Sequence, residues 1–257
     1  MEKLRQARSR TEDIIVQPVL YSQQSIGLQG AVNARELGGY ISEDGRRIKR
    51  GRLIRSGQLC SLTAEDKRIL SEKLHTGLVI DLRTRRETED MPEVPDFGAA
   101  HINLPVVDGT DGGERDLYQR IMFSVTAGEA YRSFFRLLLE SPDRKAILFH
   151  SVYGKDRTGV AAALLLTALG IPENTVIEDY LLSNKMKAYS VQLNGKQIEL
   201  PAFRDNHGTP GNVYAHSLEF AFSTAIVEFG SIDMYLREFC GMSGFDIRAL
   251  RDKFLES

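Results

Sequence analysis

Residues 150–159 read HSVYGKDRTG. A short apolar run at 145–149 precedes them and predicts a buried strand, and an uninterrupted apolar segment from Val160 to Leu169 follows them and predicts a helix. At such a junction the backbone N–H groups of the loop and the first helical turn have no partner within the helix, and the positive end of the helix dipole points the same way. The segment therefore predicts a loop that surrounds an oxyanion, with phosphate as the expected ligand.

The side chains of this loop suit the same ligand. Gly154 lets the backbone turn close to it, the planar fork of Arg157 can hold two of its oxygens, and the Thr158 hydroxyl lies near the helix start. A loop that binds no anion would not explain why all these features occur together at this spacing. We expect the phosphate contacts to come from Val152, Tyr153, Gly154, Lys155, Arg157 and Thr158.

The loop resembles the His-Cys-x-x-Gly-x-x-Arg-Thr/Ser-Gly loop of the cysteine-dependent protein tyrosine phosphatases, with Ser151 at the position of the nucleophilic cysteine. In that family a thiolate attacks phosphorus and forms a phosphocysteine that water then hydrolyses. A serine hydroxyl ionises at a much higher pH than a thiol, and the sequence offers no adjacent base, because the resemblance gives His150 a structural role. We expect this Ser151 chain to bind phosphate and to be nearly inert as a catalyst.

Two explanations of Ser151 stay open. Either the cysteine of a working phosphatase was replaced to trap substrate, or the chain is a natural pseudophosphatase that only binds phosphorylated ligands. Asp156, Arg157 and the glycines of the loop are all present, whereas a relic without catalytic demand would be free to lose them. The intact loop therefore favours the first explanation.

Other stretches extend the resemblance over about residues 25–257. The sequences NARELGG at 33–39 and DLRTRRE at 81–87 resemble elements of the bacterial tyrosine and lipid phosphatases, whose loop also carries Lys-Asp before the arginine. The resemblance implies an α/β fold with a central sheet flanked by helices, in a single domain over 1–257. We expect residues 1–24 to be a loose N-terminal extension and residues 185–230 to be a helical insertion, either a lid over the pocket or a structural cap.

Asp156 is the first candidate for the general acid that protonates the leaving oxygen. It lies inside the loop, and the resemblance gives it a catalytic place; the alternative is a carboxylate that braces the loop by pairing with Lys155 or Arg35. Lys155 itself adds a positive charge that can hold a further phosphate, which would admit phosphoinositides, or it is simply a solvated loop lysine. Arg157 is expected to stabilise the transition-state oxygens.

Asp81 is the second candidate acid, because it ends a predicted strand at 78–82, beside the site. A salt bridge to Arg83 or Arg157 would explain Asp81 equally well. Arg35 and Arg83 either add positive potential or serve as ion-pair partners at the edge of the core. The third group of candidate acids lies in the polar stretch 106–120, which we expect to be mobile: Asp108, Asp111 and Asp116.

Composition fits one soluble, enzyme-sized unit. Of the 257 residues, 33 are basic and 35 acidic, so the net charge of −2 gives no indication of nucleic-acid binding. Cys60 and Cys240 are far apart beside apolar residues, and each is expected to be a buried free thiol rather than part of a disulfide. The charged N-terminus predicts neither a Sec-type signal nor a membrane span, so we expect a cytoplasmic protein or one exported by another route.

No cofactor is expected, and the spacing of the histidines along the chain indicates no metal site. The sequence thus predicts a hydrolase of phosphate monoesters in its cysteine form, with phosphotyrosine as the leading substrate and phosphoinositides, phosphoserine and phosphothreonine as further candidates. Phosphorylated proteins or lipids would be its partners, and its oligomeric state is not determined by the sequence. Two other functions stay open. One is a noncatalytic phosphate-binding adaptor, and the other is a rhodanese-like sulfur transferase, although a sulfur transferase would also need the missing cysteine.

Overall fold

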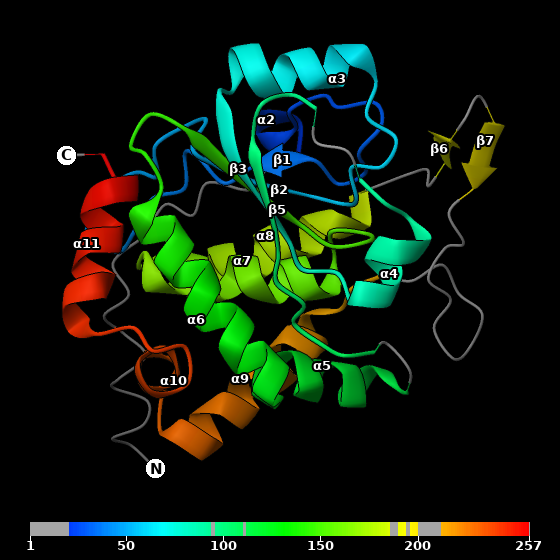
Figure 1. Ribbon diagram of the computed structural model, residues 1–257. Helices are drawn as coiled ribbons and strands as arrows, with labels where there is room; N and C mark the ends of the chain where they lie inside the picture. Colours follow the sequence, from blue (N-terminus) through cyan, green and yellow to red (C-terminus); the bar gives the residue numbers. More distant parts are fainter. Residues whose placement is uncertain are drawn as a thin grey trace.

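A mixed five-stranded sheet forms the centre of the computed structural model, which describes residues 21–93, 96–109, 112–185, 190–193, 196–199 and 212–256 (Figure 1). Its strand order is β1-β2-β5-β3-β4. The first pair is antiparallel and the others are parallel. The strands are β1 (Arg35–Glu36), β2 (Leu53–Ser56), β3 (Thr76–Asp81), β4 (Ala100–Asn103) and β5 (Ala146–His150).

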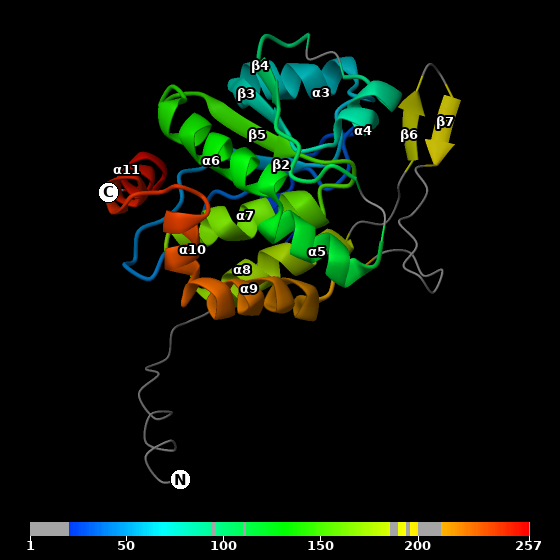
Figure 2. The same cartoon turned by 60° about the horizontal axis from the view of Figure 1, so that its bottom comes forward.

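Helices cover both faces of this sheet (Figures 1 and 2). On one face lie α3 (Ala64–Arg68) and the π-helical turn η1 (Ile69–Lys73), after the short α2 (Tyr21–Gln24); α4 (Arg85–Asp90) follows β3. The other face carries a larger helical layer with α7 (Asp156–Ala168) at its centre. Around α7 lie α5 (Glu114–Phe123), α6 (Val125–Glu140), α8 (Glu173–Leu181), η2 (Leu182–Lys185), α9 (Ala215–Phe229), α10 (Ile232–Glu238) and α11 (Gly244–Phe254). The predicted α/β class, a sheet flanked by helices, is confirmed.

Successive strand residues serve the two faces in turn, as the pleat requires. On β5, Ile147 and Phe149 belong to the larger core with α7, whereas Ala146 and Leu148 belong to the smaller core with η1. All of these side chains are fully buried, which explains why this strand is continuously apolar rather than alternating.

The local predictions around the loop hold with small shifts in their bounds. Thr63 caps α3 and forms a reciprocal capping box with Asp66. The apolar helix expected from Val160 begins four residues earlier, at Asp156, because the polar loop residues 156–159 already have helical geometry. Consequently Arg157 and Thr158 lie in the first turn of α7.

The prediction of a helical insertion over residues 185–230 needs correction. Residues 190–199 include an antiparallel pair, β6 (Ser190–Leu193) and β7 (Lys196–Glu199), rather than a helix. The predicted apolar helix exists as α9, but Leu218, Ala221 and Ala225 bury it within the large core, and it packs against α5 and α10. It is therefore part of the helical layer. Residues 186–189, 194–195 and 200–211 lie outside the described part.

Most of the predicted N-terminal extension, residues 1–20, also lies outside the described part, and residues 21–24 form α2. Among the helices that the structure describes, none is both long and apolar enough to cross a bilayer. Both cysteines are free thiols, and Cys240 is buried as predicted, whereas the predicted burial of Cys60 is wrong because its side chain is partly exposed.

Candidate active site

The loop between β5 and α7 has its carbonyl groups turned outward. The Val152 carbonyl accepts a hydrogen bond from the backbone N–H of Gln58 at 3.1 Å. The Gly154 carbonyl accepts from Asn33 Nδ2 at 2.7 Å and from Arg55 Nη2 at 2.9 Å. Because C=O and N–H point in opposite directions across a planar trans peptide, the following N–H groups are directed to the inside of the loop. This is the donor arrangement that a phosphate requires.

Gly154 is required at its position for two reasons. Its φ of +65° lies in the left-handed region, and a Cβ there would come within 2.4 Å of the Ser56 carbonyl oxygen. The loop therefore passes so close to the end of β2 that no side chain fits between them.

A buried ion network supports the loop from below. Asp179 of α8 accepts from Arg35 Nε at 3.2 Å, from Arg55 Nη1 at 2.6 Å and from the Tyr40 hydroxyl at 2.9 Å. The two arginine side chains are fully buried. Arg35 is thus an ion-pair partner, one of its two predicted roles, but its partner is Asp179 and not Asp156. Sequence reasoning missed Asn33, Arg55 and Asp179 as supports of the loop.

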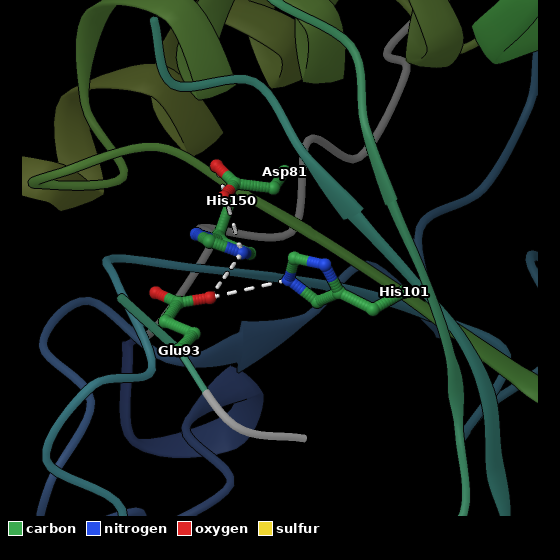
Figure 3. A group of neighbouring side chains, drawn as sticks. All are labelled: Asp81, Glu93, His101 and His150. Atoms are coloured by element: carbon green, nitrogen blue, oxygen red, sulfur yellow. Dashed lines mark hydrogen bonds and ion pairs between the residues drawn. The ribbon is translucent and has the colours of Figure 1, made fainter. Parts of the chain in front are cut away.

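Ser151 is buried at the base of the loop, with 2% of its surface exposed. Thr158 Oγ1 donates a hydrogen bond to Ser151 Oγ at 2.9 Å. The imidazole of His150 faces Glu93 and Asp81 instead (Figure 3), so no base among these groups is positioned to take the serine proton. The Thr158 hydrogen bond would stabilise negative charge on Ser151 Oγ, but without a base to take its proton the hydroxyl is not activated as a nucleophile.

Arg157 is held by a carboxylate that the sequence did not single out. Its Nη1 and Nη2 atoms donate to the two oxygens of Glu87 at 2.5 and 2.9 Å. Glu87 also closes a capping box with Thr84 at the start of α4. Burial alone would raise the pKa of Glu87, but the Arg157 guanidinium lowers it, so the carboxylate stays ionised. The S/T-x-x-E pattern at 84–87 was the available signal.

A cavity of about 280 Å³ opens beside the loop. Asp156 and Arg157 lie on its wall together with apolar side chains from the loop, from α5 and from the residue that follows α4. Asp156 Oδ1 accepts a hydrogen bond from the Tyr118 hydroxyl at 2.7 Å. The lining residues are Gln58, Glu87, Asp90, Met91, Leu117, Val152, Tyr153, Asp156 and Arg157.

Lys155 is buried, with 4% of its surface exposed, so it is not the solvated loop lysine considered as an alternative. Burial lowers the pKa of its ammonium group, and the nearby charge of Asp156 opposes that effect. Lys155 is not among the residues that line the cavity described above.

Asp81 does not reach the cavity. Its carboxylate pairs with Arg83, whose Nη2 lies 2.8 Å from Oδ2, and both side chains are buried. This is the salt bridge predicted as the alternative to a catalytic role. Asp108 accepts from Thr126 Oγ1 at 2.9 Å and Asp116 from the Gly113 amide at 3.4 Å; neither lines the cavity. Asp111 lies outside the described residues.

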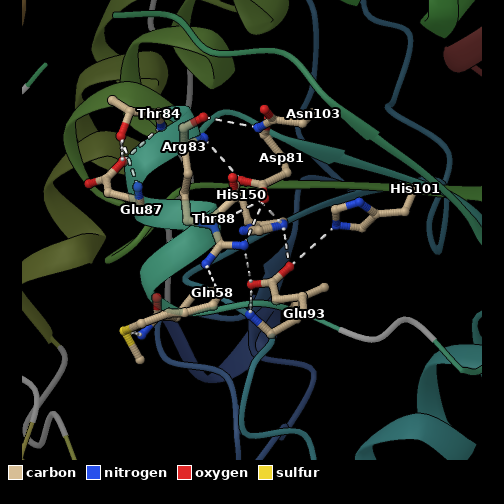
Figure 4. Close-up of polar contacts among 12 residues, drawn as sticks. Gln58, Asp81, Arg83, Thr84, Glu87, Thr88, Glu93, His101, Asn103 and His150 are labelled. Carbon is tan, nitrogen blue, oxygen red and sulfur yellow. Dashed lines mark hydrogen bonds and ion pairs between the residues drawn. The ribbon is translucent and has the colours of Figure 1, made fainter. Parts of the chain in front are cut away.

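Behind the loop, the fold brings together Asp81, Glu93, His101 and His150, whose potential ligand atoms lie within 4.8 Å of one another (Figure 3). Their spacing along the chain gave no hint of this grouping. Glu93 Oε2 lies 3.2 Å from His150 Nε2 and 3.3 Å from His101 Nε2. Arg83 occupies the same cluster and lies 3.3 Å from Glu93 Oε1 (Figure 4). With this guanidinium balancing the carboxylates, the arrangement is that of a buried ion network.

Two known proteins are similar in sequence to this chain over most of its length. The chain is 31% identical over 242 residues to a Cupriavidus necator protein whose name assigns it to the tyrosine-protein phosphatases, covering 87% of this chain and 85% of the relative. It is 25% identical over 277 residues to the triple specificity protein phosphatase PtpB of Mycobacterium tuberculosis, covering 89% and 98%.

Among solved structures, the catalytic domain of the S. cerevisiae phosphatase SIW14 in complex with citrate matches with a TM-score of 0.35 and 15% identity, over 51% of this chain and 70% of that one. The model of the tyrosine phosphatase family matches residues 26–256, which include the loop and its supporting network. This protein belongs to the tyrosine phosphatase family.

Proposed function

We propose that this chain, with Ser151 replaced by cysteine, is a phosphate monoester hydrolase of phosphotyrosine that works through a phosphocysteine intermediate, and that the Ser151 chain binds substrate without turnover. The observation that carries the proposal is the loop, with its inward N–H groups and Arg157 at one wall of the cavity. The assignment of roles is part of the proposal: Arg157 stabilises the phosphoryl oxygens, and Asp156 protonates the leaving group.

The cavity wall favours an aryl phosphate as the substrate. Met91, Leu117, Val152 and Tyr153 line it, and these apolar groups suit the ring of a phosphotyrosine side chain. The relative named triple specificity phosphatase supports testing phosphoinositides, phosphoserine and phosphothreonine as well.

The first experiment converts Ser151 to Cys and measures hydrolysis of a phosphotyrosine peptide, phosphoserine and phosphothreonine peptides, and a phosphoinositide panel in reducing buffer. A thiolate in this loop should raise turnover by several orders of magnitude over the serine chain. Ser141→Cys, which adds a buried thiol at the end of α6, is the matched control and should leave the chain inactive.

Arg157→Lys in the Ser151→Cys enzyme tests the role of the guanidinium fork. It keeps the positive charge but loses the bidentate geometry, so kcat should fall about 100- to 1,000-fold.

The second candidate function is a natural pseudophosphatase, which Ser151 itself favours. An inactive Ser151→Cys enzyme, with the Ser151 chain still binding phosphotyrosine peptide in calorimetry, would decide for this candidate. Absence of both turnover and binding would contradict both functions.

A further inference from the structure

Three helices meet at the hydroxyl group of Tyr118. Tyr118 belongs to α5, Asp156 begins α7, and Tyr180 lies near the end of α8 (Figure 1). The Tyr118 hydroxyl donates to Asp156 Oδ1 at 2.7 Å and is in short contact with the Tyr180 hydroxyl. The two tyrosines are at most 1% exposed. They therefore form a buried chain of hydroxyl groups that ends on the carboxylate in the cavity wall.

The direction of this chain follows from the number of protons. Each phenol has one proton to donate, and an ionised carboxylate can only accept. The single hydroxyl proton of Tyr118 is donated to Asp156. The Tyr118 hydroxyl oxygen must therefore accept the hydrogen bond from the Tyr180 hydroxyl. Burial and the nearby charge of Asp156 raise the pKa of both phenols well above the ordinary value, so both remain protonated donors.

The backbone of α7 is adapted to this arrangement. A Cβ on Gly159 would lie 2.8 Å from Cδ2 and Cε2 of Tyr180, so the ring packs directly against the first turn of α7. The glycine that follows Thr158 thus admits the second tyrosine, and a larger residue would push it away from Tyr118.

We propose that Tyr118, supported by Tyr180, is a positioning residue that holds Asp156 by Oδ1 and so leaves Oδ2 as the oxygen that carries the proton of the reaction. This inference rests on the proposed function, in which Asp156 is the general acid. In a neutral carboxyl group the carbonyl oxygen accepts hydrogen bonds better than the hydroxyl oxygen does, so the Tyr118 hydrogen bond to Oδ1 favours the proton on Oδ2. Oδ2 therefore protonates the leaving oxygen as its bond to phosphorus breaks, and the resulting carboxylate is stabilised by the Tyr118 hydrogen bond.

The kinetic test compares Tyr118→Phe with its parent, the Ser151→Cys enzyme, on two substrates. A phosphotyrosine peptide has a poor leaving group that needs the acid, whereas para-nitrophenyl phosphate has a good one that does not. We expect kcat for the peptide to fall about tenfold or more, a smaller loss for para-nitrophenyl phosphate, and an unchanged KM. Asp156→Asn should show the same pattern more strongly, and adding Tyr118→Phe to it should cost nothing further.

Tyr131→Phe is the matched control, because Tyr131 is also a buried tyrosine but its hydroxyl has no hydrogen-bond partner among the described residues. It should leave both rates unchanged. Equal losses on the two substrates, or an additive double variant, would show that Tyr118 is merely structural and would overturn the inference.

A second readout needs no turnover. In the Ser151 chain, carbon NMR at one fixed neutral pH records the chemical shift of the Asp156 carboxyl carbon, which should change in Tyr118→Phe because Oδ1 loses its hydrogen-bond donor. The other charged groups near this site are Lys155 and Arg157, which flank Asp156 in the chain, Glu87, which pairs with Arg157, and Glu114, whose charge affects Tyr180. All of these are unchanged in the variant, so the shift reports the phenol alone.

An unaltered carboxyl signal would overturn the inference while leaving the proposed function intact. An inactive Ser151→Cys parent would instead refute the proposed function, and the carboxyl signal would then decide by itself whether Tyr118 holds Oδ1.

Discussion

Asp179 is the single carboxylate on which two buried arginines depend. Burial alone would raise the pKa of Asp179, but the charges of Arg35 and Arg55 outweigh that effect and lower it. Tyr40 adds a third hydrogen bond at 2.9 Å. Since Arg55 also donates to the Gly154 carbonyl, the carboxylate links the stability of the fold to the shape of the loop.

Asp179→Asn should destabilise the protein by about 3–5 kcal/mol, because two guanidinium groups would stay buried with no counter-charge. The midpoint of chemical denaturation measures this loss. Asp252→Asn is the control, since its side chain is 76% exposed, and it should change stability by less than about 0.5 kcal/mol. Similar losses in the two variants would contradict the importance of the buried pairs.

The sequence motif predicted the close turn at Gly154 and the place of Arg157 and Thr158 beside the start of a helix, because local geometry determines these features. It could not predict Asp179 as the partner of Arg35, since 144 positions separate these residues and only the packing of α8 beneath β1 and β2 brings them together. The same is true of Tyr118 and Asp156, which are 38 positions apart.

At the scale of an element, α4 combines a helix cap with a contact to Arg157 of the candidate active site. Glu87 occupies the third position of the helix, where its side chain caps Thr84 and also fixes the fork of Arg157. The capping pattern could be seen in the sequence, but the contact with Arg157 depends on how α4 follows β3 and approaches α7. Sequence therefore predicts the cap and not the contact.

Glu87→Gln separates these two functions, because glutamine still caps a helix but cannot form the ion pair with Arg157. We expect phosphotyrosine peptide to bind the Ser151 chain about tenfold more weakly, since the guanidinium loses its bidentate anchor. Calorimetry measures the affinity. Glu89→Gln, at an exposed position of the same helix, should bind as the parent does. If Glu87→Gln binds the peptide as tightly as the parent does, the ion pair with Glu87 does not orient the Arg157 guanidinium for binding, and the prediction is wrong.

Considering the whole molecule, the cluster of Asp81, Arg83, Glu93, His101 and His150 joins three parallel strands to the segment after α4 (Figure 4). Asp81 pairs in register with His150 on one side and with Asn103 on the other. The apolar runs predicted β3 and β5, but neither β4 nor the order of the strands in the sheet. The grouping of two histidines with two carboxylates follows from that order together with the path of the segment after α4, which carries Glu93.

The cluster makes the free energy of unfolding decrease both at low pH, through Glu93, and at high pH, through His150. Burial opposes ionisation of Glu93, but His150, His101 and Arg83 lower its pKa, so its contribution is lost as the pH falls through the folded value. Burial likewise opposes charge on His150, but Glu93 and Asp81 raise its pKa, so its contribution is full below about pH 6.5 and is lost as the pH rises through the folded value.

The Glu93 and His150 pair should therefore stabilise the fold most between about pH 4.5 and 6.5. Denaturation midpoints of the parent and of Glu93→Gln, compared across about pH 3 to 9, measure the difference. The gap between them should be widest inside this window. A gap that does not vary with pH would show that the pair is not ionised in the folded protein.

Beneath the loop, Arg35 and Arg55 together carry one positive charge more than Asp179 can neutralise. Dissolved ions cannot approach this excess charge, because all three side chains are at most 1% exposed. A phosphate held above it would feel an attraction that ionic strength screens only weakly. Affinity for phosphate esters should thus persist at salt concentrations that abolish binding to a patch of surface lysines.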